Sequence, residues 1–311
     1  MNRPIFLIGL LLLWHGTVGI GWAQNEEPSL VGILDPDGQY AFAMNYFRSG
    51  DNHRAVSEFD RFVHFFPDDD RVESAMLFAA QAVHREGRPA DALKRYRRIV
   101  ERYPESRSAV RAGFESATCL MDLNEPEEAK SLLLKMAETA SSSEIRDEAL
   151  YRTAWIDLSH ARFSEAARLA EQIGPIGKER YRITDLQERL EQAADIPRKD
   201  PALAGFLSIL PGGGYAYCGR YRDAAVAFFL NVAFVAATVE AFRDGNDALG
   251  CLVGFVGSGF YLGNIYGGIN AAEKTNRNAL RVFIERTASD FRMDPRTGKT
   301  DGFGIRIHSD F

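Results

Sequence analysis

The residues best suited to chemistry, histidine and cysteine, are few and scattered along this sequence. The six histidines stand at positions 15, 53, 64, 84, 160 and 308, and no two of them have H-x-x-x-H spacing. Catalysis needs a nucleophile, a base or a metal held in close geometry, and the chain also lacks a G-x-S-x-G elbow. We therefore predict a protein that is not an enzyme and that requires no metal and no cofactor.

The three cysteines do not describe a disulfide framework, because their number is odd. Cys119 falls within a predicted helix, where we expect a small core residue. Cys218 and Cys251 both fall in an apolar C-terminal region and could pair, but sequence constrains pairing only weakly. The sequence therefore leaves open whether these two cysteines form a disulfide.

A glycine-rich run and the overall charge argue against two further kinds of ligand. Gly214 to Gly219 has the G-x-x-x-x-G spacing of a phosphate loop, but Arg220-Tyr221 follows where Lys-Ser/Thr is required, and no strand precedes it. The net charge is −6, whereas a nucleic-acid partner would require a basic face. We expect no phosphate loop and no nucleic-acid partner.

The N-terminus has the pattern of a secretory signal peptide. Arg3 gives a short positive region, Ile5 to Trp14 is apolar, and small residues at Gly21 and Ala23 predict cleavage before Gln24. No cysteine follows the predicted site, so a lipoprotein anchor is not expected. The alternative is an uncleaved anchor, because the apolar stretch continues to Trp22.

An internal repeat is the strongest signal in the sequence. Four turns begin at Gly50, Gly87, Asn124 and Ala161, so that 37 residues separate each turn from the next. An alanine lies seven residues before each turn, and another lies five residues after it. Small side chains let two antiparallel helices approach closely, and glycine and asparagine tolerate left-handed backbone angles. The eight alanines that we predict at the helix crossings are Ala43, Ala55, Ala80, Ala92, Ala117, Ala129, Ala154 and Ala166.

These residues resemble the tetratricopeptide-repeat (TPR) family over residues 36–173, although the usual repeat has about 34 residues. The segments Phe59–Pro67 and Tyr96–Pro104 are similar to the subgroup found in bacterial envelope assembly. That subgroup includes the helical lipoprotein of the outer-membrane β-barrel assembly machine and the periplasmic coordinator of the Tol–Pal system. Repeats three and four depart from the pattern, because they lack the terminal proline. The resemblance implies an all-α solenoid of about four helical hairpins that binds other proteins or peptides of the envelope.

The resemblance also implies which residues line the concave surface of the array. They stand three before, one after and four after the first alanine of each repeat. A bound peptide or partner helix could cover their aromatic rings, or the rings could pack between adjacent repeats. The sequence leaves both interpretations open. The twelve residues are Tyr40, Met44, Phe47, Leu77, Gln81, His84, Phe114, Thr118, Met121, Tyr151, Trp155 and Leu158.

Past the repeats, charged residues around Tyr181, Leu186 and Leu190 predict a helix over Lys178–Ala194 that caps the array. The alternation of Phe303, Ile305 and Ile307 predicts one short strand near the C-terminus. The predicted boundaries are a signal peptide at 1–23, the array with its cap at 36–195, a proline-containing linker at 196–201, a hydrophobic module at 202–272 and a tail at 273–311.

The hydrophobic module contains two apolar stretches, Ala224–Phe242 and Ala248–Tyr266. Each approaches the roughly 20 residues that cross a bilayer, so we predict a membrane hairpin. Asn231, Glu240 and Asn264 lie in or near these stretches, where we expect polar pairing and not a transport pathway. Glycines at short intervals predict close helix packing, and they are Gly250, Gly254, Gly257, Gly259, Gly263 and Gly267.

The run from Pro211 to Asp223 is similar to poorly characterised two-helix membrane modules with a Pro-Gly-x-Gly-x-x-Tyr-x-Gly signature. An exported N-terminus places the array in the periplasm and returns the C-terminus to the same side. Arg220, Arg222 and Lys274 then flank the hairpin outside the cytoplasm, against the positive-inside rule. The pair therefore spans a membrane, more in keeping with the inner than the outer one, or lies shallowly in it, or stacks beneath the array.

Two functions follow from these patterns. The first is an envelope scaffold that binds proteins through its array and contacts membrane lipid through its C-terminal module. The alternative is a structural subunit of an envelope assembly or secretion complex that has no free peptide groove. A transport or enzymatic role of the hairpin has the least support, because no catalytic constellation accompanies it.

Overall fold

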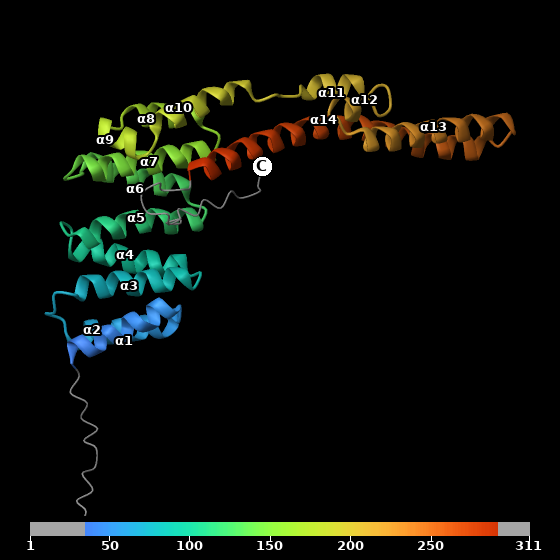
Figure 1. Cartoon of the computed structure of the whole chain (residues 1–311). Coiled ribbons are helices and arrows are strands. Elements are labelled where there is room, and N and C mark those ends of the chain that lie inside the picture. Colours follow the sequence, from blue (N-terminus) through green and yellow to red (C-terminus); the bar gives the residue numbers. More distant parts are fainter. Residues whose placement is uncertain (1–34, 292–311) are drawn as a thin grey trace, which may run out of the picture.

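The computed structural model describes residues 35–291, and every regular element in that range is a helix (Figure 1). The first eight helices form four antiparallel hairpins stacked side by side, which we call the array. This is the predicted α-solenoid. The paired helices are α1 (Pro36–Ser49) with α2 (Asn52–Phe65), α3 (Val72–Arg85) with α4 (Pro89–Arg102), α5 (Arg107–Asp122) with α6 (Pro126–Glu138), and α7 (Ser143–Ser159) with α8 (Phe163–Glu171).

The turn inside each hairpin uses a left-handed residue at the same place in the repeat. Gly50 has φ 82°, Gly87 has φ 74°, Asn124 has φ 61° and Ala161 has φ 60°. Glycine adopts this conformation freely, whereas alanine does so only at a cost of roughly 1–2 kcal/mol. The fourth turn therefore keeps the geometry of the other three with a less suitable residue.

The eight alanines predicted at the helix crossings of the four hairpins are each at most 1% exposed. Large side chains on the second helices fill the space beside them, and Phe59, Tyr96 and Leu133 are completely buried. Small residues at the crossings let the helices approach, so that these large residues reach the core between repeats.

Two short helices and one 3₁₀ turn close the array after α8. They are α9 (Pro175–Arg180), α10 (Ile183–Gln192) and η1 (Ala193–Asp195). Ile183, Leu186 and Leu190 are buried on the inner side of α10, and its other side chains are mostly charged. This is the amphipathic pattern of a terminal cap.

The C-terminal part begins with α11 (Pro201–Leu207) and α12 (Gly213–Tyr217), and continues with α13 (Tyr221–Arg243) and α14 (Asp247–Phe291). We call α13 and the part of α14 that runs beside it the hairpin. Figure 1 shows the hairpin projecting away from the array. Helix α14 has 45 residues and is about 67 Å long at 1.5 Å per residue.

The sequence predicts that the second apolar stretch ends near Tyr266, but α14 continues to Phe291. No glycine or proline follows Gly268 within the helix, and Ala, Glu, Lys and Arg are frequent there. These residues are strong helix formers, so nothing in the local sequence ends the helix.

The far end of α14 packs into the array (Figure 1). Ile284 is 1% exposed and Ala288 is 6% exposed, and both belong to the main hydrophobic core. One chain segment therefore connects the apolar hairpin to the repeat core. The predicted signal peptide at 1–23 and the predicted strand at 303–307 lie outside the described residues.

Candidate functional site

The twelve residues predicted to line the concave surface lie on the first helices, α1, α3, α5 and α7. We call the surface that they form the concave face. None of the twelve is exposed. Phe47, Leu77, Gln81, Phe114, Trp155 and Leu158 are buried, and Tyr40, Met44, His84, Thr118, Met121 and Tyr151 are half-buried.

The aromatic ring of Phe47 on this face is in contact with side chains of two repeats. Its ring centroid lies 5.1 Å from that of Phe78 on α3 and 6.2 Å from that of Phe59 on α2. The guanidinium of Arg85 lies 4.1 Å from the centre of the Phe47 ring, close enough for a cation–π contact. Phe47 therefore packs between the first two repeats.

An arginine also lies over a phenylalanine ring two repeats later. The guanidinium of Arg152 lies 4.5 Å from the centre of the Phe114 ring. In both pairs the arginine follows the phenylalanine by 38 residues, close to one repeat. A side chain from the next first helix thus shields each ring from solvent.

Polar and flexible side chains remain accessible between these covered rings. His84 Nε2 lies 2.7 Å from Asp122 Oδ2, which joins α3 to α5 across the concave face. Arg48 is exposed at the end of α1, and Met44 and Met121 are half-buried. In the first three repeats the face therefore combines charged groups with unbranched thioether side chains, which adapt to different partners.

The fourth repeat is covered by the chain itself. Tyr151 stacks on Tyr181 with ring centroids 4.3 Å apart, and burial raises the pKa of Tyr151 to about 12. The rings of Trp155 and Phe291 meet edge to face at 5.7 Å, and Arg182 lies 5.1 Å from the Phe291 ring. The end of α14 therefore occupies this part of the concave face.

A buried ionic group stabilises the junction between the third and fourth repeats. Asp157 is completely buried, and both its carboxylate oxygens lie 2.8 Å from Lys130 Nζ. Arg162 Nε lies 2.7 Å from Asp157 Oδ1, and Arg162 also pairs with Glu127. Sequence reasoning missed this group, because its members are separated in the chain and match no motif. It holds α6, α7 and the turn after α7 together.

The hairpin has its largest apolar side chains on the outside. Phe229 is 68% exposed, Val235 is 65% exposed and Phe255 is 79% exposed. The most apolar windows of α13 and α14 have mean hydropathies of 1.9 and 1.5. By length and composition, both helices could cross a membrane.

The six hairpin glycines lie in two kinds of surroundings. A Cβ built on Gly250, Gly254 or Gly257 would lie within 3.2 Å of a side chain of α13. A Cβ on Gly259 or Gly263 would meet no atom within 4 Å. A Cβ on Gly267 would collide with Tyr215 of α12. The α13 side chains near Gly250, Gly254 and Gly257 are, in that order, those of Phe242, Thr238 and Phe234.

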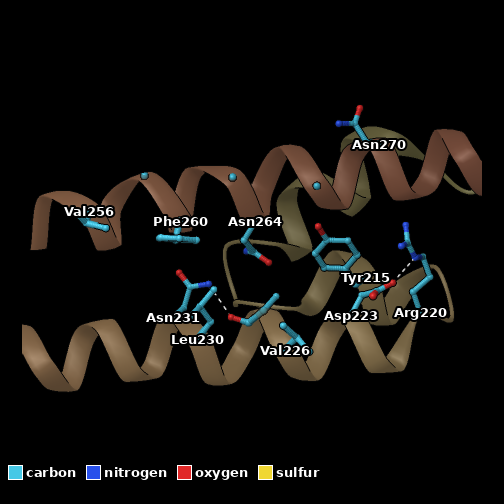
Figure 2. Close-up of a pocket in the computed structure, with 14 residues that line it drawn as sticks. Tyr215, Arg220, Asp223, Val226, Leu230, Asn231, Val256, Phe260, Asn264 and Asn270 are labelled. Carbon is cyan, nitrogen blue, oxygen red and sulfur yellow. Dashed lines mark hydrogen bonds and ion pairs between the residues drawn. The ribbon is translucent and has the colours of Figure 1, made fainter. Parts of the chain in front are cut away.

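A cavity of about 740 Å³ opens beside the second set of glycines, between α13 and α14 (Figure 2). The ion pair of Arg220 and Asp223 closes one end, with Nε to Oδ2 at 2.6 Å. Tyr215 and Asn231 point into the space between the helices (Figure 2). The volume is in the range of small-molecule sites.

Asn264 joins this cavity to the short helices. Its Oδ1 accepts a hydrogen bond from the Gly212 backbone N–H at 2.9 Å. Its Nδ2 donates to the Ser208 carbonyl oxygen at 2.7 Å. Both ends of the amide are therefore satisfied, and Asn264 fixes α11 and α12 against α14.

The cysteines are all free thiols. Cys218 and Cys251, for which the sequence left pairing open, form no disulfide. Cys119 is buried in the array, and burial raises the pKa of its thiol to about 12. Such a thiol is a poor nucleophile at neutral pH.

Comparison with known proteins agrees with this architecture. The tetratricopeptide repeat profile matches residues 73–106, which cover α3, α4 and the turn before α5. This match covers one hairpin, and the four stacked hairpins together form a TPR-like α-solenoid.

Three solved structures are similar to the chain at low scores. One is a tetratricopeptide repeat protein from Parabacteroides merdae, with TM-score 0.43 and 13% identity over 82% of this chain and 92% of that chain. Another has nearly identical TPR-like repeats and is described as a kinesin light chain from Podosopora anserina; its TM-score is 0.37, with 17% identity over 63% of this chain and 93% of that chain. A substituted form of those repeats scores 0.38, with 16% identity over 51% of this chain and 91% of that chain. Scores this low carry no argument, so the fold is assigned from the arrangement of the helices in this structure. No curated protein matches the sequence.

Proposed function

We propose that this protein is a non-enzymatic scaffold of the cell envelope, which binds other proteins through its TPR array and is tethered to a membrane by its hairpin. The array is expected on the periplasmic side, and the hairpin in the inner membrane, because a signal-like segment precedes the repeats. The tetratricopeptide class supports protein binding. The exposed apolar side chains of α13 and α14 support the tether.

The continuity of α14 is the observation that carries the proposal. Its first half lies beside α13 in the apolar hairpin, and its last turns lie in the repeat core, where Ile284 is 1% exposed. A flexible linker would let the array drift from the membrane. A helix buried at its far end holds the array at a set height and orientation instead.

Membrane fractionation tests the tether. The full-length protein should remain in the membrane pellet after a carbonate wash at pH about 11, which releases peripheral proteins. A matched variant with Phe229→Glu, Val235→Glu and Phe255→Glu should move to the soluble fraction, since each charge in hydrocarbon costs about 2.5–3.5 kcal/mol. Release of the unmodified protein by the wash would contradict the tether.

Protease accessibility tests the location. In cells with a permeabilised outer membrane and an intact inner membrane, added protease should digest the array. A cytoplasmic marker protein should survive in the same sample. Protection of the repeats would place the array in the cytoplasm and contradict this part of the proposal.

Site-specific photocrosslinking tests partner binding without disturbing the covered rings. A photoreactive residue at Met44 or Met121 should give a discrete crosslinked band in cells. The matched control is Lys94 on α4, which is exposed on the opposite side of the array. Equal crosslinking at all three positions would argue against a concave binding face.

One observation favours the alternative, a structural subunit with no free peptide groove. None of the twelve predicted partner-binding side chains is exposed, and α14 already covers Trp155. A structural subunit should co-purify in fixed stoichiometry with the same proteins under all conditions. A scaffold that binds peptides should lose its partner reversibly when a competing segment of that partner is added.

A further inference from the structure

Helix α14 has two glycine faces, and only one of them is packed. Gly250, Gly254 and Gly257 lie against α13. The next glycine is two residues further along, which turns the position by about 200° around the helix. Gly259 and Gly263 therefore lie to the side of the α13 contact, where they line the cavity, and nothing lies within 4 Å of a Cβ built on either of them.

The open face forms one wall of the cavity between α13 and α14, which we call the glycine groove (Figure 2). Gly259 and Gly263 are four residues apart on one side of α14, and Tyr215 covers Gly267, the next glycine at this spacing. Two open glycines at this spacing expose backbone, onto which another transmembrane helix can pack closely. The chain's own side chains leave about 740 Å³ of this space unfilled.

Asn231 is a second, independent sign of a missing partner in this groove. It is 5% exposed, and its Nδ2 donates to the Ala227 carbonyl oxygen at 2.7 Å. Its Oδ1 accepts no hydrogen bond from any residue that the structure describes. Asn231 follows Arg220 by eleven residues, or about 16 Å along α13, which is half of a hydrocarbon core of roughly 30 Å. Lipid tails offer no donor at that depth.

We propose that the glycine groove is the dimer interface of this protein, occupied by the hairpin of a second copy in the same membrane. This inference rests on the membrane placement of the hairpin proposed above. Two copies with the same orientation present their open glycines at the same depth, so the open face is complementary to itself under two-fold symmetry. The two Asn231 side chains then share one depth, and each carboxamide can donate to the other's free oxygen.

A lipid alone would not both fill the groove and donate a hydrogen bond to Asn231. A hydrocarbon chain could fill the groove, but it leaves Asn231 Oδ1 without a donor. A water-soluble peptide could supply a donor, but it would have to bury its own backbone polar groups at the bilayer centre. A transmembrane helix has satisfied its backbone already and brings side-chain donors to the required depth.

Disulfide crosslinking in native membranes tests the interface directly. The background lacks the free thiols Cys218 and Cys251 and retains buried Cys119. Gly259→Cys and Gly263→Cys should each give a covalent dimer on mild oxidation. Ser258→Cys is the matched control, because Ser258 is exposed on the same helix and lies outside the groove. Equal crosslinking at all three positions, or none at any, would overturn the proposal.

Filling the groove provides a second test that should leave the monomer folded. Gly263→Leu adds a side chain where nothing lies within 4 Å, so it should weaken dimerisation about 10-fold or more while leaving helicity unchanged. Asn231→Leu should weaken it by about 3- to 10-fold. Ser258→Leu should have little effect. The dimer dissociation constant would be measured by dilution in detergent micelles or nanodiscs.

The outcomes separate this inference from the proposed function. Carbonate-resistant membrane binding with a monomer at every concentration would overturn the dimer and leave the tether standing. Release from the membrane by carbonate would contradict the tether itself. A monomer that retains one lipid in native mass spectrometry, and loses it on Gly263→Leu, would assign the groove to lipid and overturn the dimer.

Discussion

The array and the hairpin are both built from antiparallel helix pairs, but their interiors and exteriors are reversed. In the array, Phe59 and Tyr96 are completely buried. In the hairpin, Phe255 is 79% exposed, whereas Asn231 and Asn264 are each 5% exposed. Water drives large apolar residues inward, and a bilayer removes that drive and penalises exposed polar groups instead. With the hairpin in the proposed membrane, the contrast is what two different solvents would require.

The type of residue at the helix contacts also differs between the array and the hairpin. The array uses alanines that are at most 1% exposed, and large neighbouring side chains supply the buried area. The hairpin uses glycines such as Gly250, over which the Phe242 ring lies. In the proposed membrane there is no hydrophobic drive between helices, so close backbone approach would supply more of the packing energy.

Truncating a large aromatic residue should give the greatest difference between the two regions. Phe59→Ala should destabilise the array by about 3–5 kcal/mol, because it leaves a cavity in a closed core. Phe255→Ala should change the unfolding free energy of the hairpin by less than about 0.5 kcal/mol. Thermal and denaturant unfolding of the detergent-solubilised protein, followed by circular dichroism, would measure both. Comparable losses would mean that the hairpin exterior is covered.

Buried polar residues test the same contrast, because the array buries charged groups and the hairpin buries neutral amides. Asp157→Asn should destabilise the array by about 3 kcal/mol, because it leaves Lys130 without its carboxylate and Arg162 with only that of Glu127. The hairpin interior relies on neutral amides, so Asn264→Leu should instead release α11 and α12, which it fixes. Hydrogen exchange would distinguish these results. Faster exchange in α6–α8 is expected for the first variant, and in α11 and α12 for the second.

The point where the regions meet should show an intermediate effect. Trp155 and Phe291 should be coupled by about 0.5–1.5 kcal/mol in a double-mutant cycle of Trp155→Ala and Phe291→Ala, as expected for an edge-to-face pair. A coupling near zero would mean that the end of α14 is not docked in solution. The control cycle pairs Trp155→Ala with Phe255→Ala, two residues without contact, and should be additive.

Local features of this fold could be predicted from the sequence, whereas the meeting of its two regions could not. The 37-residue spacing places turn residues such as Gly50, and their left-handed angles follow from chemistry within a few residues. The contact of Trp155 with Phe291 joins residues 136 apart in sequence, and no local pattern specifies it. The same is true of the glycines. Their spacing indicated helix packing, but which of them face α13 depends on which side of α14 packs against that helix.

The smallest expected effect concerns the turns, where the array and the hairpin both use a residue with positive φ. Ala161 has φ 60° and Gly245, in the hairpin turn, has φ 76°. Ala161→Gly should stabilise the array by about 0.5–1 kcal/mol, because relief of the left-handed strain exceeds the entropy that glycine adds to the unfolded chain. Gly245→Ala should destabilise the hairpin by about 1 kcal/mol, although no atom lies within 4 Å of the added Cβ. Opposite signs in unfolding measurements would show that backbone conformation sets the turn residue in both regions. A loss of stability for Ala161→Gly would instead mean that the alanine methyl makes contacts worth more than the strain.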